Sequence, residues 1–245
     1  MTRVAIVTGG TGAIGGAICR ALTASGHAVA AIGHPADAGR LDDWRAGFDG
    51  EPPAVELADL ADHEAAARAV TALERKLGPA DALVNAAGIT RDARFTRMTP
   101  EAWRAVIAAN LDSAFNTSHA VFAGMCDRGY GRIVNISSVN GQKGQFGQAN
   151  YSASKAGLHG LTMALAQEGA RANVTVNTVA PGYIATPMVE AIKPEARAAI
   201  EAQIPMRRLG SPEEIARAVA FLVAEDAAYI TGAILPVNGG LFISH

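Results

Sequence analysis

The sequence predicts an α/β fold, a doubly wound parallel sheet of about seven strands with helices on both faces. Two patterns support this prediction. Short apolar runs alternate with amphipathic segments along all 245 residues. Most of these runs are continuously apolar, which is typical of parallel strands that helices cover on both sides. No linker, repeat or low-complexity stretch interrupts the alternation, so we expect a single dinucleotide-binding catalytic domain over residues 1–245.

The apolar runs define the expected strands in chain order. Amphipathic helices are expected between them: one ends at Gly26, another ends at Gly78, and a long one begins after Thr99. Right-handed crossovers between successive strands then give a Rossmann-type sheet. Residues 187–210, between the sixth strand and the last helix, suit a mobile lid over a substrate. The expected strands cover residues 4–7, 28–32, 54–57, 82–85, 132–137, 174–179 and 233–237.

Composition narrows the functional classes. A net charge of −2 gives no reason to expect nucleic acid or a membrane surface as a partner. No apolar stretch approaches about 20 residues and no signal-peptide pattern precedes the first strand, so we expect a cytoplasmic protein. The two cysteines and six histidines lack metal-ligand spacing, and no metal site is expected.

A glycine-rich segment connects the first expected strand to the first helix. Residues 8–15 read Thr-Gly-Gly-Thr-Gly-Ala-Ile-Gly. Glycines in such a turn let the backbone approach a pyrophosphate, and the helix N-terminus that follows favours an anion. We therefore expect a dinucleotide cofactor here, in contact with Gly9, Thr11, Gly12, Ala13 and Ile14.

The end of the second strand predicts which dinucleotide binds. A carboxylate about 20 residues past the glycines binds the ribose hydroxyls of the unphosphorylated cofactor. Gly33 and His34 occupy that place, and Arg40 follows within reach. The sequence therefore favours NADPH or NADP, with Arg40 at the 2′-phosphate. Asp37 is the alternative, because a loop could bring its carboxylate to the ribose.

Further cofactor contacts are expected where other strands end, at the carboxyl edge of the sheet. Asp59 ends the third strand and could either accept from the adenine amino group or cap the next helix. Small residues after the fourth strand leave room for a cofactor, and a Pro-Gly turn follows the sixth. The predicted contacts at these places are Ala58, Asp59 and Leu60, then Asn85, Ala86, Ala87 and Gly88, and finally Pro181, Gly182 and Ile184.

A serine, a tyrosine and a lysine follow the fifth strand in a spacing that suits carbonyl–alcohol redox chemistry. Tyr151 and Lys155 are four residues apart, so they lie above one another on one helix face. A free tyrosine titrates near about 10, and we expect the ammonium to lower that pKa toward neutrality. Ser138, which has the thirteen-residue spacing to Tyr151 that its neighbour Ser137 lacks, would hold the substrate oxygen. Arginine outnumbers lysine seventeen to four in this chain, so lysine here indicates a need for a compact ammonium.

Together these motifs resemble the short-chain dehydrogenase/reductase family over essentially the whole chain. The resemblance rests on residues 8–15, residues 85–88, Asn110 and the Ser-Tyr-Lys set, in that order. Two departures are small: Ala13 and Ala86 stand where many members carry glycine and asparagine.

The resemblance implies a role for each catalytic residue. Tyr151 would deliver a proton to a ketone oxygen that Ser138 also binds. Lys155 would lower the pKa of the phenol and bind the nicotinamide ribose. Asn110 would hold a water that links Lys155 to solvent.

Residues 132–148, 156–160 and 181–186 further resemble the acetoacetyl-CoA reductases of polyhydroxybutyrate synthesis within that family. This implies NADPH-dependent reduction of acetoacetyl-CoA to (R)-3-hydroxybutyryl-CoA, for polyhydroxyalkanoate precursor supply, by a homotetramer. Pro187 stands where that subgroup carries an aspartate. Carried over by position, the residues that line the substrate path are Asp92, Gln145, Phe146, Gly147, Gln148 and Tyr183, with Ser138 and Tyr151 at the reacting end.

Two alternatives remain open. A 3-oxoacyl-[acyl-carrier-protein] reductase of fatty acid synthesis would use the same chemistry but needs a basic patch at the site mouth, for which Arg128, Arg132 and Arg171 are candidates. A non-catalytic NADP(H)-binding regulator on the same fold would not need the Ser-Tyr-Lys set. For a coenzyme A substrate, the candidate phosphate contacts are Arg91, Arg94 and Arg97.

Overall fold

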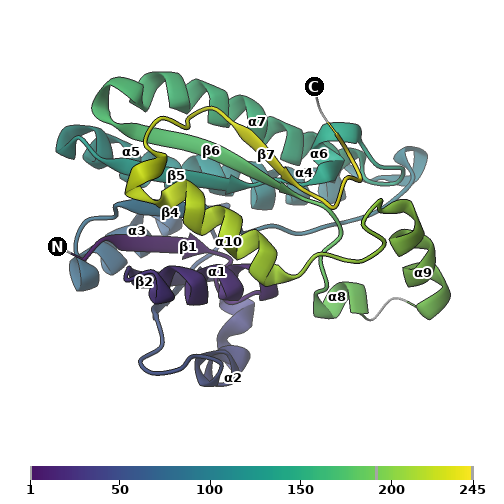
Figure 1. The fold of residues 1–245 in the computed structure, drawn as a ribbon, viewed down its shortest axis with the longest axis horizontal. Coiled ribbons are helices and arrows are strands. Elements are labelled where there is room, and N and C mark those ends of the chain that lie inside the picture. The colour runs from purple at the N-terminus through teal and green to yellow at the C-terminus, as the bar shows by residue number, and fades with distance from the viewer. Residues whose placement is uncertain (1, 191–192, 244–245) are drawn as a thin grey trace.

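The computed structural model describes residues 2–190 and 193–243 and contains a seven-stranded sheet whose strands are all parallel. The strand order is β3-β2-β1-β4-β5-β6-β7, so the chain builds outward in both directions from the middle of the sheet (Figure 1). The predicted fold class is confirmed. The strands are β1 Val4–Thr8, β2 Ala28–Gly33, β3 Ala54–Leu57, β4 Ala82–Asn85, β5 Gly131–Ile136, β6 Val174–Pro181 and β7 Ile234–Val237.

Helices cover both faces of the sheet (Figure 1). The α-helices are α1 Ala13–Ala24, α2 Leu41–Ala46, α3 His63–Leu77, α4 Pro100–Ile107, α5 Ser113–Arg128, α6 Val139–Lys143, α7 Ala149–Gly169, α8 Pro187–Glu190, α9 Pro194–Gln203 and α10 Pro212–Val223. The shorter turns are the 3₁₀ segments η1 Pro35–Arg40, η2 Phe95–Arg97, η4 Ala170–Ala172 and η5 Glu225–Ala227, and the π-helical turn η3 Ala108–Asp112.

The apolar strands explain this layering. Strands β1, β4, β5 and β6 are buried along their whole length, as expected for parallel strands that helices cover on both faces, although β5 and β6 also carry polar side chains such as Arg132 and Asn177. One apolar cluster joins the sheet to α1 and α10, around Ile18, Leu22 and Val219. The other joins it to α3, α5 and α7, around Leu73 and Met125. Each fully buried aliphatic side chain of this size stabilises the fold by about 2 kcal/mol.

Two helical segments differ from the prediction. The long helix expected after Thr99 is divided into α4 and α5 by the π turn η3, which widens the helix locally and contains Asn110. The residues after β2 form η1 and α2 rather than a loop. The indole Nε1 of Trp44 on α2 donates to Gly10 O at 2.9 Å, so this segment is tied to the glycine-rich turn.

The predicted lid region contains α8 and α9. Residues 191–192, which include Ile192, lie outside the described residues. The chain that returns from α9 packs on the body of the protein, because Ile204 and Leu209 are buried and Ile184 forms a bridge with Gly210. The role of residues 187–210 as a lid stays a prediction.

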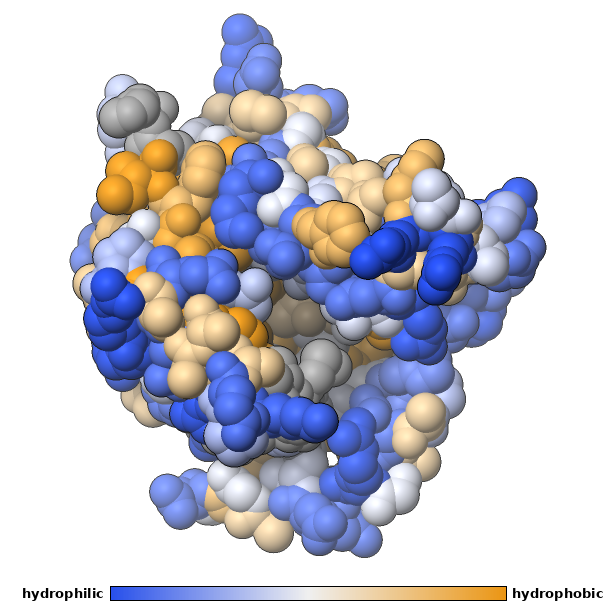
Figure 2. Space-filling model, turned by 90° about the vertical axis from the view of Figure 1, so that its right-hand side faces the viewer, coloured by the Kyte–Doolittle hydropathy of each residue, from blue (hydrophilic) through white to orange (hydrophobic). Residues whose placement is uncertain are grey.

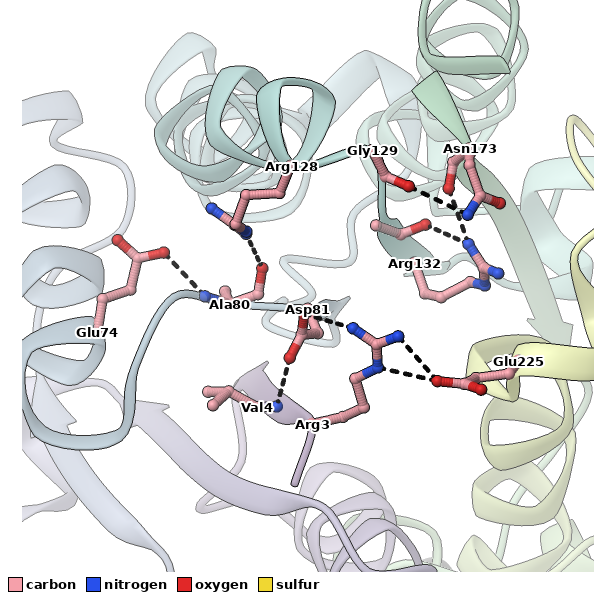
Figure 3. Close-up of polar contacts among 11 residues, drawn as sticks. Arg3, Val4, Glu74, Ala80, Asp81, Arg128, Gly129, Arg132, Asn173 and Glu225 are labelled. Atoms are coloured by element: carbon pink, nitrogen blue, oxygen red, sulfur yellow. Dashed lines mark hydrogen bonds and ion pairs between the residues drawn. The ribbon is translucent and has the colours of Figure 1, made fainter. Parts of the chain in front are cut away.

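At the amino edge of the sheet, charged side chains bond to one another (Figure 3). Arg3 lies 3.2 Å from Asp81 Oδ1 and 2.8 Å from Glu225 Oε1. The other oxygen of Asp81 accepts from Val4 N at 2.9 Å. These bonds connect the start of β1 to the segment before β4 and to η5.

The arginines that were candidates for a docking patch also lie at this edge, and Figure 3 shows two of them, Arg128 and Arg132. Arg128 donates to Ala80 O at 2.6 Å, and Arg132 is 1% exposed in the second position of β5. Arg171 lies in η4, directly before β6. All three stand where strands begin, whereas the expected site lies where strands end, so the prediction of a basic patch at the site mouth is wrong for these residues.

Candidate active site

The glycine-rich turn packs closely against the segment that follows β4. Gly9 has φ +62°, and a Cβ there would lie 2.9 Å from Ala87 Cα. A Cβ on Gly15 would lie 2.1 Å from Gly9 O. Gly12 is the N-cap of α1, and both it and Ala13 are exposed. The N-terminus of α1 therefore stays open beside Ala86 and Ala87, an arrangement that fits a pyrophosphate.

The segment after β2 brings a carboxylate to this turn. Asp37 Oδ2 accepts from Thr11 Oγ1 at 2.7 Å and from His34 N at 3.1 Å, while its Oδ1 pairs with Arg40. Burial alone raises the pKa of Asp37, but the bonds from Thr11, Arg40 and His34 outweigh it and lower the pKa. Asp37 therefore lies beside the glycine-rich turn, as its alternative role would require. The exposed Arg40 is already paired with it.

The residues after β3 and β6 frame the same edge. Asp59 is exposed and its Oδ1 accepts from Ala61 N at 3.0 Å, whereas the cap of α3 is Asp62. Ala58 N donates to Gly33 O, so it continues the sheet edge. Leu60 and Ile184 are buried in the apolar clusters, and Ile184 also lines a cavity at this edge. At the end of β6, Pro181 is the last residue of the strand and Gly182 N donates to Val237 O.

Ser138 follows β5 and is the N-cap of α6. Its Oγ accepts from Asn140 N at 3.1 Å, and the residue is 8% exposed. Ser137 has a different environment, since its Oγ bonds to Lys155 O and His159 Nε2, each at 2.8 Å. The hydroxyl of Ser137 therefore holds α7 on the sheet, and Ser138 remains the candidate serine for binding the substrate.

Tyr151 and Lys155 lie on consecutive turns of α7, as the spacing predicts. Lys155 Nζ is 5.7 Å from the centroid of the Tyr151 ring and donates to Ile136 O at 2.8 Å. Burial lowers the pKa of Lys155 to about 8. Burial also raises the pKa of Tyr151, which the Ser138 hydroxyl lowers in part and Asp92 raises further. The expectation of a lowered tyrosine pKa is wrong for the protein as described, because the loss of solvation outweighs the effect of the neighbouring groups.

Asn110 lies beside the lysine. Its Oδ1 accepts from Ile89 N at 2.7 Å, and its Nδ2 donates to Ile89 O and Ser154 Oγ. A Cβ on Gly88 would lie 3.1 Å from Asn110 Oδ1 and 3.3 Å from Lys155 Nζ, so both side chains pack closely on Gly88. Asn110 thus fixes the chain after β4 against α7. Its side-chain amide already has partners, and a water relay would have to use its main chain.

The predicted substrate residues after β4 and α6 form one wall. Gln148 Nε2 donates to Asp92 Oδ2 at 2.8 Å, and Ala93 N donates to Gly147 O at 2.9 Å. Phe146 is 79% exposed, and the guanidinium of Arg94 lies 5.6 Å from its ring centroid. Gln145 is also exposed, and its Oε1 accepts from Lys143. The face at the carboxyl ends of the strands is hollowed near its middle, with mostly hydrophilic side chains around the hollow (Figure 2).

Tyr183 lies in the segment that follows β6. It lines a cavity of about 320 Å³ between the chain that returns from α9 and the end of β7, with Met206, Arg208 and Asn238 among its neighbours. None of the other predicted substrate residues lines this cavity. Hydrogen bonds therefore connect Gln148 to Asp92 and Gly147 to Ala93, whereas Tyr183 is placed by the cavity that it lines.

Asn140 is the site residue that sequence reasoning missed. It donates through its main chain to Ser138 and through its side-chain Nδ2 to Gln148 Oε1 at 2.9 Å. The signal in the sequence was weak, because an asparagine two positions after a serine is a common helix-capping pattern.

The residues that the structure describes hold no cluster of three or more His, Cys, Asp or Glu side chains arranged for a metal ion. Among these residues, no helix combines the length and apolar character needed to cross a bilayer.

Comparison with known proteins gives full-length matches. A family model described as enoyl-(acyl carrier protein) reductase matches residues 10–242. The chain is 53% identical to an acetoacetyl-CoA reductase of Allochromatium vinosum, over 99% of this chain and all of that protein. It is 52% identical to the acetoacetyl-CoA reductase of Cupriavidus necator, over 98% of each chain. A 3-oxoacyl-[acyl-carrier-protein] reductase of Vibrio cholerae is 44% identical, again over 98% of each.

Proposed function

Because the chain belongs to the short-chain dehydrogenase/reductase family, we propose that it reduces acetoacetyl-CoA to (R)-3-hydroxybutyryl-CoA with NADPH. The observation that carries the proposal is the meeting of Ser138, Tyr151 and Lys155 at the end of β5, beside an open α1 N-terminus. Full-length relatives at 52–53% identity carry the acetoacetyl-CoA reductase name, whereas the carrier-protein reductase stands at 44%.

The residues around the glycine-rich turn fit a nicotinamide dinucleotide. The close packing of Gly9 on Ala87 leaves no room for a side chain at Gly9, and the exposed first residues of α1 can receive a pyrophosphate. Lys155 would bind the nicotinamide ribose. The cofactor, when bound, supplies the hydride for the ketone carbon.

The protein's own residues handle the proton. A phenol whose pKa is raised keeps its proton at neutral pH, so Tyr151 can give it to the ketone oxygen. Ser138 Oγ already accepts from Asn140 N, which leaves its O–H to donate to the same oxygen. Lys155, with a pKa of about 8, is mostly charged at pH 7 and favours the phenolate once the proton has left. The ketone gains hydride at carbon and a proton at oxygen and becomes a secondary alcohol.

The phosphorylated cofactor is the finer part of the proposal. Gly33 and His34 place no carboxylate directly at the end of β2, and the exposed Arg40 guanidinium can turn to a 2′-phosphate. Asp37 acts against this preference, because its negative charge would face the phosphate. Dissociation constants for NADPH and NADH, from quenching of protein fluorescence, test it; tighter binding of NADH would contradict it.

Coenzyme A rather than carrier protein is the proposed carrier. Arg91, Arg94 and Arg97 are exposed, Arg94 lies over the Phe146 ring of the substrate wall, and the three guanidinium groups could meet the nucleotide phosphates. The arginines considered for carrier-protein docking lie at the opposite edge of the sheet. Values of kcat/KM for the same acyl group on coenzyme A and on acyl carrier protein decide between the two. A clear preference for the carrier protein would overturn the proposal.

Activity itself is tested by the loss of NADPH absorbance with acetoacetyl-CoA, measured beside Tyr151→Phe. We expect turnover by the wild type and a loss of about 1,000-fold in the variant. If neither enzyme turns over any 3-oxoacyl thioester, a non-catalytic NADP(H)-binding role is the better account.

The assembly and cellular role complete the proposal. We propose a homotetramer in the cytoplasm that supplies precursors for polyhydroxyalkanoate. On α7, the small residues Ala153, Ala156 and Gly160 are exposed, which permits close approach of a partner helix. Light scattering coupled to size-exclusion chromatography tests the tetramer.

A further inference from the structure

We propose that Asn140 is a positioning residue that fixes the catalytic Ser138 to the substrate wall through Gln148 and Asp92. The inference rests on the proposed function, because it concerns the same site. It joins four residues that three successive hydrogen bonds connect, from the catalytic hydroxyl to the mouth of the site.

The inner bond sets the direction of the serine proton. Asn140 N donates to Ser138 Oγ at 3.1 Å, and Asn140 is held in α6, where its own carbonyl accepts from Gly144 N. A hydroxyl has one proton to donate. Since Ser138 Oγ serves as acceptor toward the protein, its proton is directed to the phenol and the substrate oxygen. The orientation of Ser138 therefore depends on where Asn140 is held.

The outer bonds hold Asn140 in that place. Asn140 Nδ2 donates to Gln148 Oε1 at 2.9 Å, and Gln148 Nε2 donates to Asp92 Oδ2 at 2.8 Å. Gln148 precedes α7 and Asp92 follows β4, so the chain of bonds joins three separate segments of the site.

The charge of Asp92 fixes the direction of every bond in the series. An ionised carboxylate only accepts, so Gln148 must turn its NH₂ group to Asp92 and its carbonyl to Asn140. Asn140 must then turn its NH₂ group to Gln148. Its Oδ1, which is buried, has no partner among the described residues. The Asn140 side chain is thus held by a single bond, and that bond depends on the orientation that Asp92 imposes.

The same series of hydrogen bonds also affects the pKa of Tyr151, the proposed proton donor. The negative charge of Asp92 raises the pKa of Tyr151, while the hydrogen bond from Ser138 lowers it. A displaced Ser138 would therefore leave Tyr151 with a higher pKa, even though neither Asn140 nor Gln148 carries a charge.

The test is a double-mutant cycle on kcat. Asn140→Ala and Gln148→Ala should each lower kcat for acetoacetyl-CoA about tenfold, and the double variant should lose no more than either alone, because both remove the same bond. A loss of about 100-fold in the double variant would mean independent roles and would overturn the inference. The thioester of N-acetylcysteamine, which lacks the nucleotide, should show the same pattern if the effect is on Ser138 rather than on coenzyme A contacts.

Lys143→Ala is the matched control. Lys143 is exposed on the same short helix and reaches Gln145 of the same wall, but it takes no part in the series. Its kcat should stay within about twofold of the wild type, as expected for a surface substitution. A tenfold loss in this control would show that any loosening of α6 lowers kcat, and that result would also overturn the inference.

A second readout needs no substrate, so it separates this inference from the proposed function. The ¹³Cζ resonance of Tyr151, assigned with Tyr151→Phe, reports its pKa in the apoprotein. We expect Asn140→Ala and Gln148→Ala to raise that pKa, Asp92→Asn to lower it, and Lys143→Ala to leave it unchanged. If wild type is inactive but these shifts occur, the proposed function fails and the inference stands; if Asn140→Ala leaves the pKa unchanged, the inference fails.

Discussion

The two ends of β5 each bury one cation, and the two cations are different residues. Arg132 lies at the start of the strand, is 1% exposed, and donates to the carbonyls of Gly131 and Asn173 (Figure 3). Lys155 reaches the end of the same strand from α7, is 4% exposed, and donates to Ile136 O. Among the described residues, neither cation is in an ion pair.

The difference lies in what burial does to each charge. Burial lowers the pKa of Arg132, and Tyr130, whose ring centroid is 4.4 Å from the guanidinium, partly offsets the effect. An arginine stays charged even so, because its unperturbed pKa is so high. The same loss of solvation brings the pKa of Lys155 to about 8, within reach of physiological pH. A permanent cation therefore joins the starts of two strands, and a cation that can exchange a proton stands where the chemistry is proposed.

Exchanging the two residue types should give the largest effect. Lys155→Arg should lower kcat/KM for acetoacetyl-CoA about 1,000-fold, because a guanidinium is larger and does not titrate near neutral pH. The reciprocal Arg132→Lys, at the other end of the strand, should change kcat/KM less than about twofold. Steady-state kinetics at 25 °C check both. Wild-type activity in Lys155→Arg would show that a guanidinium can replace the ammonium at the end of β5, and the two cations would then not differ in function.

Removing the structural cation should cost stability instead of activity. Arg132→Ala deletes two bonds to strand-start carbonyls and leaves a cavity, so we expect a loss of about 3 kcal/mol in the free energy of unfolding. Tm should fall by about 6–12 °C for a chain of this length. Calorimetry measures the fall, and kinetics below the transition should match wild type. A variant of unchanged Tm would show that the buried guanidinium is dispensable.

Removing the titrating cation should have the opposite effect on stability. The folded-state pKa of Lys155 lies below its unfolded value of 10.5, so its charged form opposes folding at neutral pH, and stability rises as pH increases from about 8 toward 10.5. Lys155→Met should therefore be inactive, yet raise Tm at pH 7 by about 2–6 °C. The gain should shrink at pH 9.5. Thermal melts at the two pH values test this. A Tm below that of the wild type at pH 7 would show that the buried ammonium does not oppose folding.

The carboxyl and amino edges of the sheet also differ in what their carboxylates hold. Asp37→Asn removes the charge that faces the proposed 2′-phosphate, so the ratio of the dissociation constants for NADH and NADPH should rise about tenfold. Asp81→Asn is the matched change at the amino edge, where the carboxylate holds Arg3 and Val4 N. It should lower Tm and leave the ratio unchanged. Equal ratios of the dissociation constants in the two variants would show that Asp37 does not affect the choice between NADH and NADPH.

The smallest effect concerns an exposed ion pair near the carboxyl edge. Hydrogen bonds from Arg208 and from Ser211 N lower the pKa of Glu214 to about 2. The stability that this pair contributes is present above about pH 4.5 and is lost as pH falls toward 2. Because Arg208 is exposed, Glu214→Gln should lower Tm at pH 7 by only about 1–2 °C. Melts at pH 7 and pH 3 should show the difference at the higher pH alone; a larger difference at pH 3 contradicts it.

The parts of the fold that local patterns determine were predictable. Continuous apolar runs such as residues 4–7 marked strands buried on both faces, and the glycine turn before α1 followed from its place after β1. The four-residue spacing of Tyr151 and Lys155 placed both on one face of α7, because helix geometry alone decides it.

The properties that depend on tertiary contacts were not predictable. The direction of the Tyr151 pKa depends on burial by several segments, and no spacing reveals that. Asp37 bonds to Thr11, 26 positions away, because η1 turns it back to the glycine segment. Arg132 is the instructive error, since its place at the start of an expected strand already put it at the edge opposite the site.

The pKa of Lys155 tests the central claim most directly. The chain has four lysines, so ¹³Cε resonances of selectively labelled protein can be followed against pH, with Lys155→Met to assign the signal. The account predicts that Lys155 titrates near pH 8 in the folded protein, below the ordinary lysine value of 10.5. A Lys155 whose pKa stays at that ordinary value would mean that the two ends of β5 hold equivalent cations, and it would contradict the account.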